Sequence, residues 1–159
     1  MAAVRVFYGK FRNIEESCGK LWNAVENYGN NSSGGFMIEN SVEKVCIGLK
    51  PKFKKKVIQC VDYIVKAVPD VEEIYLFGSC ARGEAKWDSD VDIAIVTEER
   101  ITDRTLRGTV QCELEWPNED GVKADVIFRA KDTQDWNKVF EKLYNEDKKL
   151  VWRRVSDRK

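Results

Sequence analysis

The sequence predicts an α/β fold in which helices flank a small, mixed β-sheet. Three short runs, VEEIYLF, VDIAIV and VKADVIF, have the length and the β-branched and aromatic content of strands. Other segments carry apolar residues three and four positions apart, as amphipathic helices do. The chain has 159 residues, 43% of them hydrophobic and 34% charged, which is enough for one ordinary hydrophobic core.

The N-terminal part is expected to form a helical extension, residues 1–50, ahead of a domain that spans residues 51–159. Apolar residues recur along it at helical spacing, at Ile14, Cys18, Leu21, Trp22, Val25 and Tyr28. GNNSSGG at 29–35 is the strongest break in the chain and could be a linker or a surface loop. The extension could cover the sheet, form a dimer or bind a partner.

A second helix is expected to begin near Pro51, because proline suits the first helical turn. Its apolar stripe consists of Phe53, Val57, Ile58, Val61, Ile64 and Val65. The basic run KPKFKKK at 50–56 opens this helix, where the helix dipole disfavours positive charge. The run could be a solvated face or a patch that contacts phosphate or RNA, and both interpretations stay open at this point.

The remaining expected elements are strands and helices in alternation. Strands are expected at 71–77, 91–96 and 122–128, with a short final strand at 148–152. Helices are expected at about 79–87 and at 102–115, where Gly108 is unfavourable by about 1 kcal/mol. The last helix should carry one apolar face made of Trp136, Val139, Phe140, Leu143 and Tyr144.

The composition excludes several kinds of protein. The chain contains no histidine, which excludes Ser-His-Asp catalysis and His-ligated zinc. Its 27 basic and 27 acidic residues balance, which argues against nonspecific binding to nucleic acid. The sequence has no run of about 18 apolar residues and no visible signal peptide, so neither a membrane span nor export is expected. Five cysteines without a C-x-x-C pair indicate reduced thiols in a cytoplasmic protein.

Three aspartates are candidate ligands of a divalent metal. Asp90 and Asp92 alternate with apolar residues, so their side chains should project from the same face of the sheet. Two parallel carboxylates repel each other unless a cation lies between them, and Mg²⁺ prefers carboxylate oxygens together with substrate phosphates. Asp125, inside VKADVIF, is unfavourable in an apolar strand unless it faces this pair from a neighbouring strand.

A candidate phosphate site precedes the aspartates. Gly78-Ser79 ends the first expected strand and opens a helix. Glycine lets the backbone approach a ligand, and a helix start presents free N–H groups. Ser79 could instead act only as the helix N-cap, and Arg82 could pair with a nearby carboxylate such as Glu84 rather than with substrate. Trp87 is expected to pack against the core rather than stack on a base.

The spacing of these residues resembles the signature of the polymerase-β-type nucleotidyltransferase superfamily, in which Gly-Ser and Asp-x-Asp are separated by ten residues. The segment LFGSCARGEAKWDSDVDIAIV is similar to the minimal nucleotidyltransferase (MNT) branch, which includes antitoxins of HEPN/MNT toxin–antitoxin pairs. The resemblance covers roughly residues 57–152. The matching positions are Gly78, Ser79, Arg82, Gly83, Ser89, Asp90 and Asp92, with Asp125 matching the third carboxylate of the family.

The resemblance implies magnesium-dependent nucleotidyl transfer. Asp90 and Asp92 would hold two Mg²⁺ ions, one of them shared with Asp125, which would also help to deprotonate the acceptor hydroxyl. A nucleoside monophosphate, AMP from ATP in the antitoxin-like case, would be transferred and pyrophosphate released. The nucleotide-binding positions implied by the resemblance are Gly78, Ser79, Arg82 and Ser89.

The resemblance also bears on the acceptor. Larger family members place an acceptor-binding helical domain after the catalytic core, whereas this chain is expected to end soon after it. This favours an antitoxin-like protein adenylyltransferase that modifies a tyrosine of a HEPN-type toxin, with a homo-oligomer as another source of the missing site. Two alternatives stay open: transfer to a small molecule such as an aminoglycoside, and a non-catalytic module that binds a nucleotide or a partner.

Overall fold

The computed structural model describes residues 42, 44–131 and 137–154. The chain divides into two units, Met1–Phe36 and Met37–Lys159, and the fold described here is that of the second. The helix expected over 14–28 and the break at 29–35 lie outside the described residues. No helix in the part that is described is long and apolar enough to cross a membrane.

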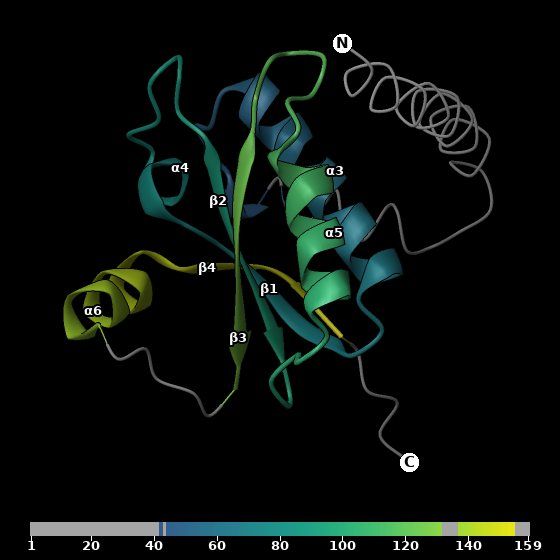
Figure 1. The fold of residues 1–159 in the computed structure, drawn as a ribbon. Helices are drawn as coiled ribbons and strands as arrows, with labels where there is room; N and C mark the ends of the chain where they lie inside the picture. The colour runs from purple at the N-terminus through teal and green to yellow at the C-terminus, as the bar shows by residue number, and fades with distance from the viewer. Residues whose placement is uncertain (1–41, 43, 132–136, 155–159) are drawn as a thin grey trace, which may run out of the picture. The chain divides into compact units, whose positions relative to one another are not determined.

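A four-stranded mixed sheet forms the centre of this unit (Figure 1). Its strands are β1 (Val71–Phe77), β2 (Val91–Thr97), β3 (Ala124–Ala130) and β4 (Lys149–Arg153), and their order across the sheet is β3-β2-β1-β4. β1 pairs antiparallel with both β2 and β4, whereas β2 and β3 run parallel. The expected α/β class with a small mixed sheet is therefore confirmed.

Several helices accompany the strands. Those with complete bounds in the described part are α3 (Pro51–Ala67), α4 (Gly78–Arg82), α5 (Arg104–Glu115) and α6 (Lys138–Asp147). α5 begins at its cap Asp103, whose carboxylate accepts hydrogen bonds from the backbone N–H groups of the first turn. Asn137 caps α6 in the same way. These side-chain caps explain why both helices begin where they do.

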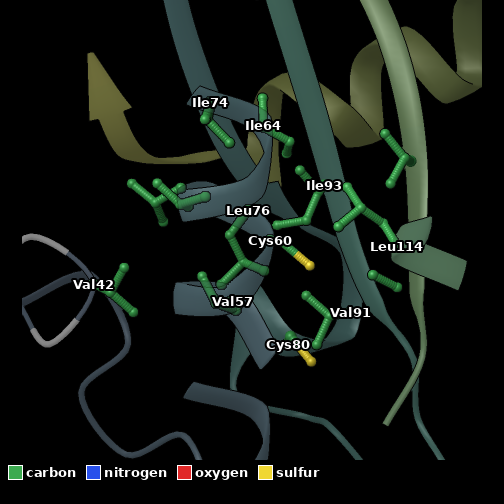
Figure 2. Close-up of a cluster of buried hydrophobic side chains, with 14 of the residues drawn as sticks. Val42, Val57, Cys60, Ile64, Ile74, Leu76, Cys80, Val91, Ile93 and Leu114 are labelled. Carbon is green, nitrogen blue, oxygen red and sulfur yellow. The ribbon is translucent and has the colours of Figure 1, made fainter. Parts of the chain in front are cut away.

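The hydrophobic core lies between the sheet and the helices α3 and α5. Figure 1 shows α3 and α5 on one side of the strands and α6 on the other. The buried residues of β1 and β2 meet the apolar stripe of α3, whose Phe53, Val57, Val61 and Ile64 are fully buried as expected. Figure 2 shows part of this cluster, in which Val57, Cys60 and Ile64 of α3 lie beside Leu76 and Ile93 of the sheet.

Two elements differ from the expected ranges, and glycines in the left-handed conformation explain both. α4 ends at Arg82, not at residue 87, because Gly83 adopts φ +77° and its N–H bonds to the carbonyl of Cys80. β3 begins at residue 124, not 122. The turn before it holds Gly121 at φ +73°, and Asn118 accepts a hydrogen bond from the N–H of Val122 at 2.9 Å.

The apolar face expected for the last helix is only partly buried. Tyr144 is buried and Phe140 is half-buried on α6, but Val139 and Leu143 are 69% and 51% exposed. A single stripe of α6, with Phe140 and Tyr144 four positions apart, faces the sheet, so Val139 and Leu143 beside it stay exposed. Trp136 lies outside the described residues.

The core extends upstream of α3. Val42, Cys46 and Leu49 are buried in the same hydrophobic cluster as the α3 stripe. The packing of this unit therefore begins before residue 50, while the division of the chain into 1–50 and 51–159 stays a prediction. Of the cysteines in the described part, Cys46, Cys60 and Cys80 are buried free thiols, and Cys112 is exposed.

Candidate active site

Asp92 and Asp125 lie side by side in the sheet. They occupy the same register position on the parallel strands β2 and β3, so both side chains project from one face. Asp90 directly precedes β2, two positions before Asp92. The structure thus places Asp125 beside Asp92, through the parallel pairing of β2 and β3, while Asp90 lies just before the start of β2.

The pKa of Asp92 reflects its burial and the nearby carboxylates. Burial, together with the negative charges of Asp125 and Asp90, raises the pKa of the Asp92 carboxyl from its ordinary value of 3.8 to about 6. The positive charge of Arg82 acts in the opposite sense and lowers the pKa. Asp92 is therefore a half-buried carboxyl that interacts with the negative charges of two other aspartates.

Gly78 packs directly against this carboxylate. Its φ is +69°, and a Cβ atom at this position would lie 2.2 Å from Oδ2 of Asp92. Phe77, the residue before it, is the register partner of Asp92 on the antiparallel strand β1. Only glycine leaves room for the Asp92 carboxylate at this bend, so the Gly-Ser turn lies directly against Asp92.

Ser79 is not the N-cap of the helix that follows. It is the second residue of α4, whose cap is Phe77 with no side-chain hydrogen bond, because the backbone turns already at Gly78. The Ser79 carbonyl accepts a hydrogen bond from the N–H of Glu84 at 2.9 Å. A capping role thus does not explain Ser79, and its expected contact with nucleotide phosphates stays a prediction.

Arg82 makes two ion pairs at the end of α4. Its Nε donates to Oε2 of Glu84 at 2.7 Å, which is the local pairing left open by the sequence. Its Nη1 donates to Oδ2 of Asp147, at the end of α6. The sequence did not indicate Asp147, because 65 residues separate the partners and an acidic residue at a helix end has no distinctive pattern.

Asp90 lies at the end of the loop that connects α4 to β2. Ser89 Oγ accepts a hydrogen bond from the backbone N–H of Lys86 at 2.8 Å, which closes this loop on itself. The Cys80 thiol donates to the carbonyl of Asp90 at 3.4 Å, so α4 also contacts the backbone of the first aspartate. Trp87 is 77% exposed, so the expectation that it packs against the core was wrong, because α4 ends before reaching it.

The three aspartates are of the chemical type that binds a divalent cation. In residues 42, 44–131 and 137–154, no three Asp, Glu or Cys side chains are gathered closely enough to hold one ion as they stand. The three aspartates nevertheless interact through their charges, and a cation between them would relieve the repulsion that raises the pKa of Asp92. Carboxylate oxygens are the protein ligands that Mg²⁺ prefers, together with phosphate oxygens of a substrate.

Comparisons with known proteins found similar sequences and structures. Over 81 residues the chain is 31% identical to the "Probable protein adenylyltransferase MntA" of Haemophilus influenzae, and the match covers 48% of this chain and 65% of that protein. A Sulfolobus solfataricus protein assigned to the nucleotidyltransferases has a solved structure with 22% identity and a TM-score of 0.46, covering 74% of this chain and 88% of its own.

A second solved structure contains the tri-AMPylated HEPN toxin of Shewanella oneidensis in complex with an MNT antitoxin. It matches with 20% identity and a TM-score of 0.41 over 60% of this chain and 68% of that chain. The sequence profile of the nucleotidyltransferase domain matches residues 49–150, a span that contains all three aspartates and the Gly-Ser turn. Because this match covers more than half of the chain, the protein belongs to the nucleotidyltransferase domain family.

Proposed function

We propose that this protein is a magnesium-dependent nucleotidyltransferase that moves AMP from ATP to a hydroxyl group on a partner protein. The observation that carries the proposal is the pairing of Asp92 with Asp125 in register, directly beside Gly78. Family membership supports the reaction class. The 31% identity to a protein named as a protein adenylyltransferase supports a protein acceptor.

The three aspartates would bind the metal. Asp90 and Asp92 would hold two Mg²⁺ ions, and Asp125 would share one of them. When bound, Mg²⁺ supplies positive charge that stabilises the triphosphate and the reacting oxygens. Because Asp92 is half-buried and partly screened from water, the electrostatic attraction between the metal ions and their ligands would be stronger than in bulk water.

The protein side chains would bind the nucleotide and accept the proton. The turn at Gly78 and Ser79 would hold the β- and γ-phosphates, with Arg82 and Ser89 as further contacts. Asp125, which is exposed on β3, would take the proton from the acceptor hydroxyl. The acceptor oxygen then bonds to the α-phosphorus while the bond from that phosphorus to pyrophosphate breaks. A carboxylate base suits this chain, because it contains no histidine.

The acceptor we propose is a tyrosine of a HEPN-type toxin that is produced in the cytoplasm together with this protein. Both proteins would then have access to cytoplasmic ATP. A second copy of this chain that completes the acceptor site is an alternative form of the assembly. Either arrangement places the acceptor beside the face of the sheet that carries Asp92 and Asp125.

The test is transfer from ATP labelled at the α-phosphate, with Mg²⁺, to whatever protein co-purifies with this one. We expect label and a mass increase of one AMP on the partner protein, with Asp90→Asn and Asp92→Asn abolishing both. Label on a small hydroxylated molecule would show a different acceptor class. Nucleotide binding without any release of pyrophosphate would overturn the enzymatic proposal in favour of a binding module.

A further inference from the structure

Arg82 is confined by Asp147 rather than by Glu84. The guanidinium contacts both carboxylates, through Nε to Glu84 and Nη1 to Asp147. The Glu84 side chain is 64% exposed, whereas the Asp147 side chain is only 12% exposed. Exposed ion pairs restrict a side chain little, because water competes for both charges. The partly buried partner, Asp147, therefore sets the orientation of Arg82.

Asp147 is itself held in place by the helix that ends at it. On α6, both carboxylate oxygens of Glu141 accept hydrogen bonds from Arg129 of β3, at 2.6 and 2.9 Å. The Arg129 guanidinium also lies 4.4 Å from the ring centroid of Tyr144. Tyr144 packs edge-to-face on Phe77, with centroids 5.5 Å apart. α6 is thus fixed to the face of the sheet that carries the aspartates.

Arg82 is the last residue of α4, the helix that begins at Gly78 beside Asp92. The positive charge of Arg82 lowers the pKa of Asp92 while its guanidinium is paired with Asp147. A guanidinium has five N–H groups, and each of the two ion pairs uses one nitrogen. The same side chain can therefore donate to an anion beside Asp92 without releasing Asp147.

We propose that Asp147 is a positioning residue that holds Arg82 in the orientation in which its guanidinium binds the phosphates of the nucleotide. This inference rests on the proposed function, since it assigns a support to the nucleotide site of that reaction. A guanidinium that is already oriented loses less conformational entropy on binding than a free one. Asp147 therefore contributes to nucleotide affinity without touching the nucleotide.

The test measures the dissociation constant of a non-hydrolysable ATP analogue with Mg²⁺, by titration calorimetry on the full chain. We expect Asp147→Asn to weaken binding about three- to tenfold, the effect of freeing one long side chain. Glu146→Gln is the matched control, because Glu146 is the adjacent, exposed carboxylate and pairs only loosely with Lys142 at 3.8 Å. It should leave the dissociation constant unchanged.

Two further variants separate positioning from a structural role. In an Arg82→Ala background, Asp147→Asn should weaken binding no further, because the group that it orients is gone. The exchange Arg82→Asp with Asp147→Arg should restore the ion pair and the melting temperature but not the affinity. This second variant keeps the test informative even if Asp147→Asn alone folds poorly.

Three outcomes would overturn the inference. Equal affinities for Asp147→Asn and Glu146→Gln would show that Asp147 has no effect on the site. Tighter binding by Asp147→Asn would show that Asp147 withholds Arg82 from the nucleotide. A further loss in the Arg82→Ala background would show that Asp147 acts through the fold. If the wild-type protein binds no nucleotide, the proposed function fails as well, and the two failures are thereby distinguished.

Discussion

Asp92 dominates the electrostatics of the site because its carboxyl is both half-buried and next to two other carboxylates. The folded-state pKa of about 6 lies above the ordinary value of 3.8, so the folded protein binds this proton more tightly than the unfolded chain does. The corresponding contribution to stability is present below about pH 4 and is lost as the pH rises through about 6.

This gives a prediction for the metal-free protein. The free energy of unfolding of the wild type should fall relative to that of Asp92→Asn between pH 4 and pH 7, because the variant has no carboxylate to ionise. Urea denaturation of both proteins in the presence of a chelator measures the difference. A difference that stays constant over this range would contradict the raised pKa of Asp92.

Gly78 offers a second prediction at the scale of one residue. Gly78→Ala should be inactive, because its Cβ would lie 2.2 Å from Oδ2 of Asp92 and displace that carboxylate. The positive φ adds a cost of about 1–2 kcal/mol for any L side chain. Gly121→Ala is the matched control, since Gly121 has a similar φ of +73° with no atom within 4 Å of the added Cβ. It should lose similar backbone stability and keep its activity.

Asp125 is the third residue whose role can be tested alone. Asp125→Asn should lower kcat far more than it weakens the binding of Mg²⁺-ATP, because the side chain would accept the proton of the acceptor hydroxyl. General-base catalysis contributes roughly 10²–10⁴-fold to rate. Steady-state kinetics together with direct nucleotide titration separates the two effects. A variant with normal kcat and weaker nucleotide binding would remove Asp125 from the proton-transfer role.

At the scale of elements, the basic start of α3 joins this helix to both loops that lead into the site. Lys52 Nζ donates to the carbonyl of Trp87, just before Asp90. Lys56 is only 1% exposed, and its Nζ donates to the carbonyl of Trp116 at 2.8 Å. Burial lowers the pKa of Lys56. The run at 50–56 is thus not simply a solvated face, since at least these two lysines bind the chain itself.

Lys56 should therefore matter for stability. Lys56→Ala should lower the free energy of unfolding by about 2–3 kcal/mol, because it removes a buried aliphatic stem and the donor to the Trp116 carbonyl. Lys54→Ala, a substitution two positions earlier on the same helix, should stay within about 0.5 kcal/mol of the wild type. Urea denaturation measures both. Equal losses in the two variants would contradict the role assigned to Lys56.

At the scale of the whole unit, the two faces of the sheet differ in their role. The side packed by α3 and α5 contains the hydrophobic core, and the side contacted by α6 carries Asp92 and Asp125 (Figure 1). The candidate site on the face contacted by α6 therefore needs no polar groups inside the hydrophobic core. The site can therefore hold repelling carboxylates, while apolar packing behind it supplies the stability.

This arrangement predicts strong stabilisation by ligand. A non-hydrolysable ATP analogue with Mg²⁺ should raise the free energy of unfolding by about 2.7 kcal/mol at a hundred times its dissociation constant. Either ligand alone should have a smaller effect, because the aspartates and the triphosphate share the cation. Thermal melts with each combination measure the shift. A shift of equal size in Asp92→Asn would place the nucleotide elsewhere on the protein.

The sequence predicted the parts of the site that depend on local spacing. The number of residues between Gly78-Ser79 and the pair Asp90 and Asp92 can be interpreted from the sequence, because a strand, a bend and a helix start each have a short sequence pattern. The same kind of reasoning does not predict that Val139 and Leu143 are exposed, since helical spacing shows that an apolar stripe exists but not how much of it another element covers. It also misplaced the end of α4, where the conformation of Gly83 ends the helix.

The sequence led us to expect Asp125 opposite the Asp90 and Asp92 pair, but how distant segments meet was decided by the folded structure. Asp125 lies beside Asp92 because β2 and β3 pair in parallel with one particular register, and a shift of one residue would have turned its carboxylate to the other face. The pairing of Arg82 with Asp147 and the burial of Lys56 depend in the same way on how helices dock. Local sequence patterns thus predicted the family signature and the strands. The arrangement of the candidate site depends on strand register and helix docking, which short-range periodicity does not predict.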